Sequence, residues 1–192
     1  MTMPEGNLLS SFQVHKSKAP WCVIGKVHTW QILSGHWSAE SEASARINGD
    51  GEENFGESLA IIGSGNWGDL ELRVKFRFKS DTIRPPEGGA IVFFLFKNVR
   101  NHLAYHFCIY KKKVQLFKKL RGIWSLLGEQ CYAFELYRDY DVVIRSRSGW
   151  HECSIDGGDP MGIHDNALRH GCIGIGGKFC DVVFSQVRVS TT

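Results

Sequence analysis

Glu152 is the carboxylate whose neighbours best suit ligand chemistry. It follows Trp150 and His151 in a segment that alternates like a strand, so Trp150, Glu152 and Ser154 share one face. An indole beside a carboxylate suits a sugar, because the ring stacks on C–H groups and the carboxylate accepts hydrogen bonds from hydroxyls. The other interpretation is a surface glutamate with Trp150 in the core, and the sequence leaves both open.

Three pairs of carboxylates lie two residues apart, and on a strand such pairs share a face at about 6.5–7 Å. That distance is close to the carboxyl separation of about 6.5–9.5 Å in an inverting glycosidase. Each pair also fits a solvated strand edge or turn, which is the interpretation we favour. The pairs are Glu40 and Glu42, Asp69 and Glu71, and Asp139 and Asp141.

Three histidines are candidate bases or metal ligands: His102, His106 and His151. No H-x-H or H-E-x-x-H spacing occurs, so we predict no metal site. His106 shares a face of its predicted strand with Cys108 and Tyr110. We expect either this face or the opposite one to be core.

Trp124 and a group of basic residues follow residue 110. Trp124 lies just after Gly122, so we predict a loop there, with the indole either exposed as a stacking platform or plugging one end of the fold. The basic residues predict a positive hairpin edge. This edge could contact sulfated glycans, phosphate or acidic lipid. We favour the other interpretation, in which the lysines discourage edge-to-edge strand pairing. They are Lys111, Lys112, Lys113, Lys118, Lys119 and Arg121.

The segment 63–68 matches the G-x-G-x-x-G pattern of dinucleotide-binding loops. Such a loop requires a following helix whose N-terminus meets the pyrophosphate. Here the next residues, 69–78, alternate between apolar and charged like a strand. We therefore predict no dinucleotide site.

The composition fits one large domain rather than a specialised class. The chain has 192 residues, and 23 Lys and Arg against 20 Asp and Glu give a net charge of only +3. A dedicated nucleic-acid binder usually has a stronger basic excess, so we expect no nucleic-acid partner. No apolar run approaches the roughly 18 residues of a membrane-spanning helix.

Short strands separated by Gly, Asp and Ser turns dominate the chain. Residues 69–78 predict a half-buried strand, and residues 90–96, apolar on both faces, predict a strand covered on both sides. The most helix-like stretch, 120–129, is interrupted by Gly122 and Gly128. Other strands are predicted at 21–24, 30–33, 58–62, 105–110, 114–118, 140–145, 151–155, 172–175 and 182–189.

Six cysteines bear on the compartment: Cys22, Cys108, Cys131, Cys153, Cys172 and Cys180. Three disulfides are one interpretation, but several cysteines lie in apolar strand-like runs, and we favour free, buried thiols. No Asn-x-Ser/Thr site occurs, and residues 1–13 lack the basic start and apolar run of a signal peptide. These features predict a cytoplasmic, reducing location.

The order of these segments resembles the concanavalin-A-like jelly-roll superfamily, and more closely its laminin-G-like and 3-keto-disaccharide hydrolase (family-16-like) domains. Each segment is ordinary β-sandwich sequence, and their shared order over about residues 28–190 carries the resemblance. The segments are Trp30 to Trp37, Trp67 to Val74, Gly88 to Phe93, Asn101 to Tyr110, Val114 to Lys119, Cys153 to Gly157, Leu168 to Ile175 and Phe184 to Val189.

The resemblance implies an all-β fold, a two-sheet antiparallel β-sandwich of jelly-roll type, with sugars on the concave sheet or its rim loops. Some relatives hold a structural calcium through an acidic residue in the closing strand, where Ser185 stands here, so no cofactor is expected. The E-x-D-x-(x)-E string of retaining glycosidases in the superfamily is also missing.

We therefore predict a loose lead-in over residues 1–20 and a single sandwich over 21–192, acting as a non-catalytic carbohydrate-binding module. A sugar-derivative hydrolase, with Glu152 or His106 as general base, is the alternative. A protein-interaction sandwich without a sugar site is a further one. The predicted ligand contacts are Trp150, Glu152, Trp124, His106 and Arg145.

Overall fold

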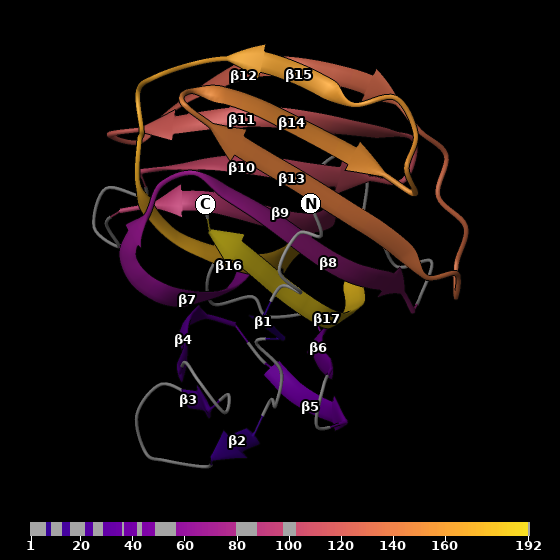
Figure 1. Ribbon diagram of the computed structural model, residues 1–192. Coiled ribbons are helices and arrows are strands. Elements are labelled where there is room, and N and C mark those ends of the chain that lie inside the picture. The colour runs from indigo at the N-terminus through magenta and orange to yellow at the C-terminus, as the bar shows by residue number, and fades with distance from the viewer. Residues whose placement is uncertain are drawn as a thin grey trace.

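The fold is two antiparallel sheets laid face to face (Figure 1). The computed structural model describes residues 7–8, 13–15, 22–24, 29–35, 37–41, 44–48, 57–79, 88–97 and 103–191. These residues contain strands and no helix, so the predicted all-β class is confirmed. The strands are β1 (Asn7–Leu8), β2 (Gln13–His15), β3 (Cys22–Ile24), β4 (Thr29–Ser34), β5 (Trp37–Ser41), β6 (Ser44–Asn48), β7 (Glu57–Trp67), β8 (Leu70–Phe78), β9 (Gly89–Phe96), β10 (Ala104–Tyr110), β11 (Lys113–Leu120), β12 (Ile123–Cys131), β13 (Tyr140–Arg147), β14 (Trp150–Ile155), β15 (Met161–His164), β16 (Gly171–Lys178) and β17 (Asp181–Thr191).

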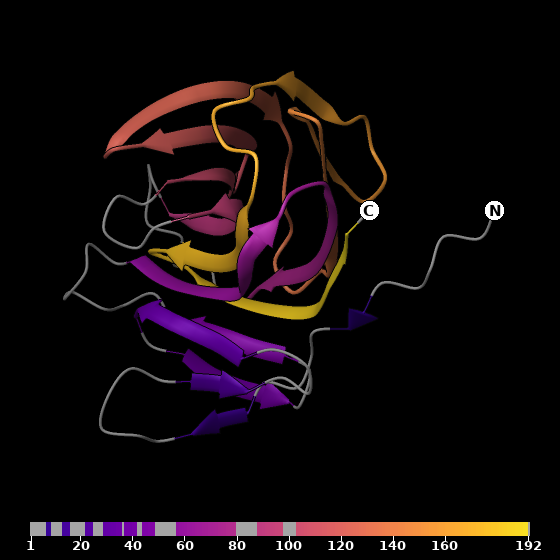
Figure 2. The ribbon, with the colours of Figure 1, turned by 60° about the vertical axis from the view of Figure 1, so that its left-hand side comes forward.

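The chain changes sheets repeatedly, as a jelly roll requires. A nine-stranded sheet has the order β12-β11-β10-β9-β16-β7-β4-β3-β2, and an eight-stranded sheet has the order β15-β14-β13-β8-β17-β6-β5, with β1 beside β17. Figure 2 shows the two layers from the side, with strands β2 to β6 gathered at one end of the sandwich and β1 apart from them. The β7–β8, β12–β13 and β16–β17 connections each pass from one sheet to the other.

The alternation predicted for residues 69–78 is confirmed by β8. Leu70, Leu72, Val74, Phe76 and Phe78 are buried on its inner face. The run that is apolar on both faces, β9, is buried along its whole length, as predicted for a strand covered on both sides. The stretch 120–129 forms most of the hairpin strand β12 instead of a helix, because it pairs with β11 along the hairpin, with one shift of register between Leu116 and Phe117.

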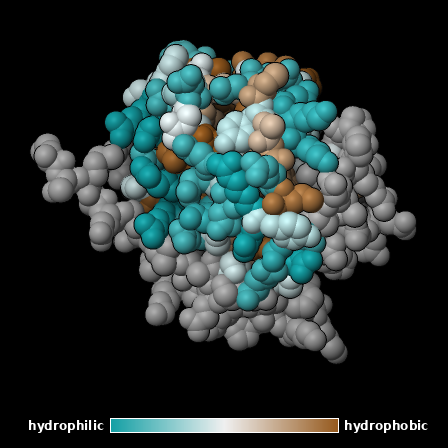
Figure 3. Space-filling view, turned by 90° about the vertical axis from the view of Figure 1, so that its right-hand side faces the viewer, coloured by the Kyte–Doolittle hydropathy of each residue, from teal (hydrophilic) through white to brown (hydrophobic). Residues whose placement is uncertain are grey.

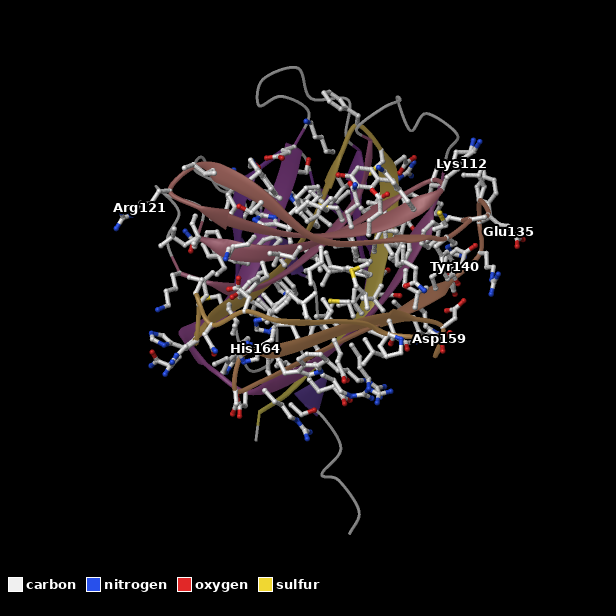
Figure 4. All side chains as sticks on the ribbon, turned by 90° about the horizontal axis from the view of Figure 1, so that it is seen from above. Lys112, Arg121, Glu135, Tyr140, Asp159 and His164 are labelled. Atoms are coloured by element: carbon white, nitrogen blue, oxygen red, sulfur yellow. The ribbon has the colours of Figure 1, made fainter. Side chains whose placement is uncertain are left out.

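Side chains fill the space between the sheets, as Figure 4 shows from above, and many of the core residues are aromatic. Phe76 stacks on Tyr140 with ring centroids 5.4 Å apart, and Phe94 stacks on Tyr105 at 5.2 Å. These pairs join β8 to β13 and β9 to β10, so each ties neighbouring strands of one sheet inside the core. Such pairs add about 0.5–1.5 kcal/mol each beyond the burial of their area.

A second apolar cluster lies on the outer face of the nine-stranded sheet. It consists of Leu59, Ile61, Ile91, Phe93, Phe96, Ala104 and Cys108. The prediction that only one face of β10 is core is therefore wrong: Tyr105 packs in the main core, whereas His106 and Cys108 are buried on the opposite face. Part of the outer face of this sheet is thus shielded from solvent by the protein's own apolar side chains.

A polar network fixes residues 165–168 against the core. Tyr105 Oη donates to Asp165 Oδ1 at 2.5 Å, and Lys118 Nζ pairs with the other carboxylate oxygen of Asp165. The backbone carbonyl of Asp165 accepts from His151 Nε2 at 2.9 Å, so His151 Nδ1 is free to accept from Ser146 Oγ at 3.0 Å. His151 is neutral in this arrangement, and its burial lowers its pKa.

Two short segments of the predicted lead-in pair with the sheets. Asn7–Leu8 pairs with β17, and Gln13–His15 pairs with β3. The boundary at residue 20 stays a prediction. In the part of the chain that the structure describes, no helix is long and apolar enough to cross a membrane.

We predict that His151 makes the folded protein sensitive to mild acid. Its lowered pKa means that the unfolded chain takes up a proton first as pH falls below its ordinary value of 6.5. The free energy of unfolding then falls by at most about 1.4 kcal/mol per pH unit. Denaturant unfolding between about pH 7 and pH 5 should show a smaller loss in His151→Gln than in the parent.

The exposed His170 provides the matched control. His170→Gln should follow the parent over the same pH range. A His151→Gln protein whose unfolding free energy declines as steeply as that of the parent would contradict the assignment.

Candidate functional site

The five predicted contact residues lie on opposite sides of the sandwich, and this corrects the prediction of one site. Trp124 and His106 belong to the outer face of the nine-stranded sheet. Trp150, Glu152 and Arg145 belong to the eight-stranded sheet, on β14 and β13. The prediction failed because period-two alternation places a residue on a face of its own strand but does not say which sheet that strand joins.

A hollow of about 620 Å³ lies on the outer face of the nine-stranded sheet. Its lining is part aromatic, part basic, and reaches from β7 across to β12. The lining residues are Glu57, Gly89, Ala90, Ile91, Cys108, Tyr110, Lys113, Gln115, Phe117, Lys119, Trp124 and Lys178. We call this the aromatic hollow.

The strand register lines up the residues of the aromatic hollow in rows. Gly176, Ile91, Cys108 and Gln115 stand opposite one another across four strands, and Glu129 of β12 completes the row. The neighbouring row ends in His106, Phe117 and Leu126. Rows of this kind place side chains from five strands about 4.8 Å apart, so the hollow is elongated across the sheet.

Trp124 is held in place on a strand, which corrects the prediction of a loop. It stands opposite Lys119 in the β11–β12 hairpin and is 42% exposed. Lys119 Nζ lies 4.5 Å from the centre of the indole, and the Phe117 ring meets it edge-on at 5.7 Å. The indole is therefore positioned before a ligand arrives, with much of its surface still open to solvent.

His106 supports Trp124 from below. Its side chain is 3% exposed, stacks on Phe93 at 5.7 Å and lies 4.7 Å from the Trp124 ring. It is not among the residues that line the hollow. The geometry gives His106 a packing role beneath the indole.

The polar side of the hollow is organised by Glu129. Lys113 Nζ donates to Glu129 Oε2 at 2.9 Å, and Gln115 Nε2 donates to the same oxygen. The Lys113 ammonium and the Gln115 amide lower the pKa of Glu129, so this carboxylate stays ionised. The two donors are thereby fixed along one wall of the hollow.

The basic residues after position 110 do not form one patch. Lys112 and Arg121 lie at opposite ends of the β11 strand (Figure 4). Lys118 points to Asp165, and Lys119 packs on Trp124. The predicted positive edge is dispersed because alternate residues of a strand point to opposite faces.

On the other sheet, Trp150 is 46% exposed, so the interpretation that places it in the core is wrong. Its Nε1 donates to Glu152 Oε1 at 2.9 Å, and the ring lies against Gly162, where an added Cβ would come within 2.8 Å of it. Arg145 Nε donates to Glu71 Oε2 at 2.7 Å. Glu152 thus accepts a hydrogen bond from Trp150, which lies two residues before it on the same face of β14.

Sequence reasoning missed the polar residues that organise both faces. Gln115 and Glu129 carry no motif, and Glu71 was considered only as half of a carboxylate pair with Asp69. Each acquires its role from a cross-strand partner. In the described part of the chain, no group of three or more His, Cys, Asp or Glu could hold a metal ion. The predicted absence of a metal site remains a prediction.

Comparisons with known proteins identify the fold. No protein-family model matches the chain, and no curated protein matches its sequence. The carbohydrate binding module CBM66 from Bacillus subtilis has a TM-score of 0.71 at 16% identity, with 84% of this chain and 95% of that one covered. The exoplasmic/lumenal domain of VIP36, in a Ca2+/Man3GlcNAc-bound form, has a TM-score of 0.62 at 12% identity over 85% of this chain and 84% of that one.

A putative glycosyl hydrolase from Parabacteroides distasonis is also similar, with a TM-score of 0.60 at 7% identity over 83% of this chain and 85% of that one. All three similarities fall below the level at which function transfers, and they establish the jelly-roll sandwich. The predicted fold class is confirmed.

We predict that Cys131 is labelled before Cys108 in the folded protein. Cys131 is exposed on β12, whereas Cys108 is 5% exposed in the hollow and burial raises its pKa to about 12. Since the thiolate is the reacting form, Cys108 should resist iodoacetamide until the protein unfolds. Peptide mass spectrometry after timed labelling measures both sites.

Cys131→Ser should remove the fast-labelled site and leave the slow ones unchanged. Labelling of Cys108 at the rate of Cys131 in the native protein would show that the hollow opens more deeply than its packing indicates.

Proposed function

We propose that the protein binds carbohydrate in the aromatic hollow, as a recognition module without catalysis. The observation that carries the proposal is a positioned, half-exposed Trp124 beside fixed hydrogen-bonding groups in one elongated hollow. Sugar rings present C–H groups that stack on an indole and hydroxyls that need donors and acceptors. Both requirements are met by neighbouring strands of one sheet.

The length of the hollow favours a chain of sugars over a single ring. Glu57 on β7 and Trp124 on β12 both line it, and five strand spacings separate β7 from β12. At about 4.8 Å each, these spacings give a span on the order of 20 Å. Trp124 at one end and Glu57 with Lys178 at the other would contact different units of an oligosaccharide.

Two of the similar solved structures support this proposal. One is a carbohydrate binding module, and another is described with Man3GlcNAc bound. The five cysteines whose side chains the structure describes are free, which supports the further proposal of a reducing, cytoplasmic location.

The alternative is a hydrolase, including the closer resemblance to 3-keto-disaccharide hydrolase domains. Glycosidases need two carboxyl groups within about 9.5 Å, one of them protonated. Near the hollow, Glu57 and Glu129 stand five strands apart, and the pKa of Glu129 is lowered by Lys113 and Gln115. These features favour binding over hydrolysis.

On the opposite face, Glu71 and Glu152 flank Arg145, two strand spacings or about 10 Å apart. Both oxygens of Glu71 accept hydrogen bonds from arginines. A carboxylate held in this way is a poor proton donor, which again favours a binding function.

We predict that Trp124→Ala lowers glycan affinity by about tenfold or more, because truncating a central aromatic contact removes much of the binding energy. A glycan array identifies the ligand, and titration calorimetry with the soluble oligosaccharide gives the affinity. Gln115→Ala should weaken the same ligand.

Trp150→Ala is the matched control, since Trp150 is equally exposed but lies on the other sheet. It should bind like the parent. Loss of affinity in Trp150→Ala with retention in Trp124→Ala would move the site to the other face and overturn the proposal.

We predict no turnover of a disaccharide panel that includes 3-keto sugars. Product formation followed by chromatography, with an authentic glycosidase as positive control, measures this. Turnover that disappears in Glu152→Gln would establish the hydrolase instead.

A further inference from the structure

A second hollow, of about 890 Å³, lies on the outer face of the eight-stranded sheet, away from the aromatic hollow. Its lining is polar and rich in arginine. The lining residues are Arg73, Val74, Lys75, Arg138, Asp141, Val142, Val143, Arg145, Ser154, Asp156, Gly157, Gly158, Pro160, Gln186 and Arg188. Figure 3 shows that the right-hand side of the molecule as drawn in Figure 1 is mainly hydrophilic, with hydrophobic residues in separate places.

Three arginines on adjacent strands form an arginine cluster: Arg73 on β8, Arg145 on β13 and Arg188 on β17. Glu71 organises two of them. Its Oε1 accepts from Arg73 Nε and its Oε2 accepts from Arg145 Nε, both at 2.7 Å. Burial alone raises the pKa of Glu71, but the hydrogen bonds from Arg145 and Arg73 bring it below its usual value, so the carboxylate stays charged.

These hydrogen bonds leave the outer ends of the guanidinium groups as donors. Each bond to Glu71 uses Nε, and a guanidinium carries four more N–H groups on its two Nη atoms. The side chains of Arg73 and Arg145 remain 55% and 42% exposed. Glu71 therefore fixes both arginines while their terminal N–H groups can still reach a ligand.

Arg188 adds a third guanidinium without a carboxylate of its own. It stands directly opposite Arg73, and the next residue along this row is Val143. Among the described residues, no acidic side chain lies within salt-bridge distance of Arg188. Like charges directly opposite each other destabilise a sheet, and an anion between them would relieve that repulsion.

A β-bulge lies beside the cluster. The register of β17 against β8 shifts between Ser185 and Arg188, and Gln186 within the bulge has a φ of 50°. A positive φ is unfavourable for a residue other than glycine, and bulges recur where a strand re-aims side chains at a site. Here the bulge places Gln186 and Arg188 in the same hollow.

The other charges of the hollow are paired. Lys75 lies 3.8 Å from Asp141, and Arg138 Nη2 lies 2.9 Å from Asp156. Among the described residues, Glu71 is the carboxylate bonded to the cluster, and Glu152, which Trp150 holds, stands opposite Arg145. Three arginines against these two carboxylates leave an excess of one positive charge.

We propose that the arginine cluster binds an oxyanion, a phosphate, sulfate or carboxylate group carried by a small ligand. Planar guanidinium groups with free Nη donors match the paired oxygens of such groups. Gln186 and Ser154 supply neutral donors at the edge. This site is separate from the proposed carbohydrate site and does not depend on it.

Calorimetric titrations with glucose, glucose 6-phosphate, glucose 6-sulfate and glucuronate test the proposal and distinguish the three anions. The Trp124→Ala protein is used throughout, so that the aromatic hollow contributes little. At least one anionic sugar should bind more tightly than glucose, and Arg188→Gln should weaken that binding about tenfold, the loss expected for one charge-assisted hydrogen bond.

Arg147→Gln is the matched control. Arg147 is exposed on the same sheet, two residues beyond Arg145, but does not line the hollow. The Arg147→Gln variant should bind the anion as tightly as the Trp124→Ala protein without it. Equal losses of affinity in Arg147→Gln and Arg188→Gln would show that net charge alone causes the effect and would overturn the proposed site.

The Glu71→Gln variant tests whether anion binding depends on the fixed positions of the arginines or only on the net positive charge of the surface. The variant gains a positive charge overall but loses the carboxylate that fixes Arg73 and Arg145. Weaker anion binding, in a variant whose folding is verified by thermal unfolding, supports the organised site. Stronger anion binding by Glu71→Gln overturns it. So does a failure of all three anions to bind the Trp124→Ala protein that carries no further substitution.

Discussion

The packing of β9 against β16 is the constraint on which the rest of the structure depends. β9 is buried on both faces, so its neighbours must accept bulky side chains on the inside and the outside of one sheet. β16 does so with glycine: a Cβ on Gly174 would lie 2.1 Å from the Phe93 ring, and one on Gly176 would lie 2.5 Å from the Leu59 side chain. These contacts fix the register, because a slip of one residue would set side chains against one another where hydrogen alone now fits.

That register determines the aromatic hollow. Phe93 lies across Gly174 and stacks on His106, and His106 in turn lies against Trp124, which belongs to the edge strand β12 and lies on the same outer face. The position of the indole therefore depends on a series of packing contacts: Phe93 packs over Gly174, His106 packs on Phe93, and Trp124 packs on His106. A binding surface supported in this way loses little side-chain freedom when a ligand arrives, which favours affinity.

The sequence predicted the strands well and the site poorly, for one physical reason. Alternation and glycine punctuation are local, so β8, β9 and the β10–β11 hairpin were correctly expected. Which strands become neighbours is not local: Trp124 and Trp150 were predicted to share a site, although they lie on different sheets. The loop predicted around Trp124 failed similarly, because Gly122 turns the chain into a strand whose pairing with β11 no local pattern specifies. Gln115 had no motif, and the pairing of Glu71 with Asp69 in the sequence did not indicate its arginine partners. Only the cross-strand contacts show the roles of both residues.

The two outer faces are built on opposite electrostatic principles. Most ion pairs on the eight-stranded sheet join exposed groups and contribute little to stability. Glu71 differs, because its side chain is only 10% exposed and a covered carboxylate is costly unless it is paired. An apolar residue at this position would avoid that cost, yet the fold places a charge there and holds it with two arginines. Stability alone does not account for such an arrangement, whereas the proposed anion site would require two guanidinium groups to be positioned in this way. The other sheet supports an exposed indole mainly by packing rings beneath it, with Lys119 beside the indole and Lys113 held by Glu129. The side chains that support the two faces therefore differ in chemistry, as the two different proposed ligands require.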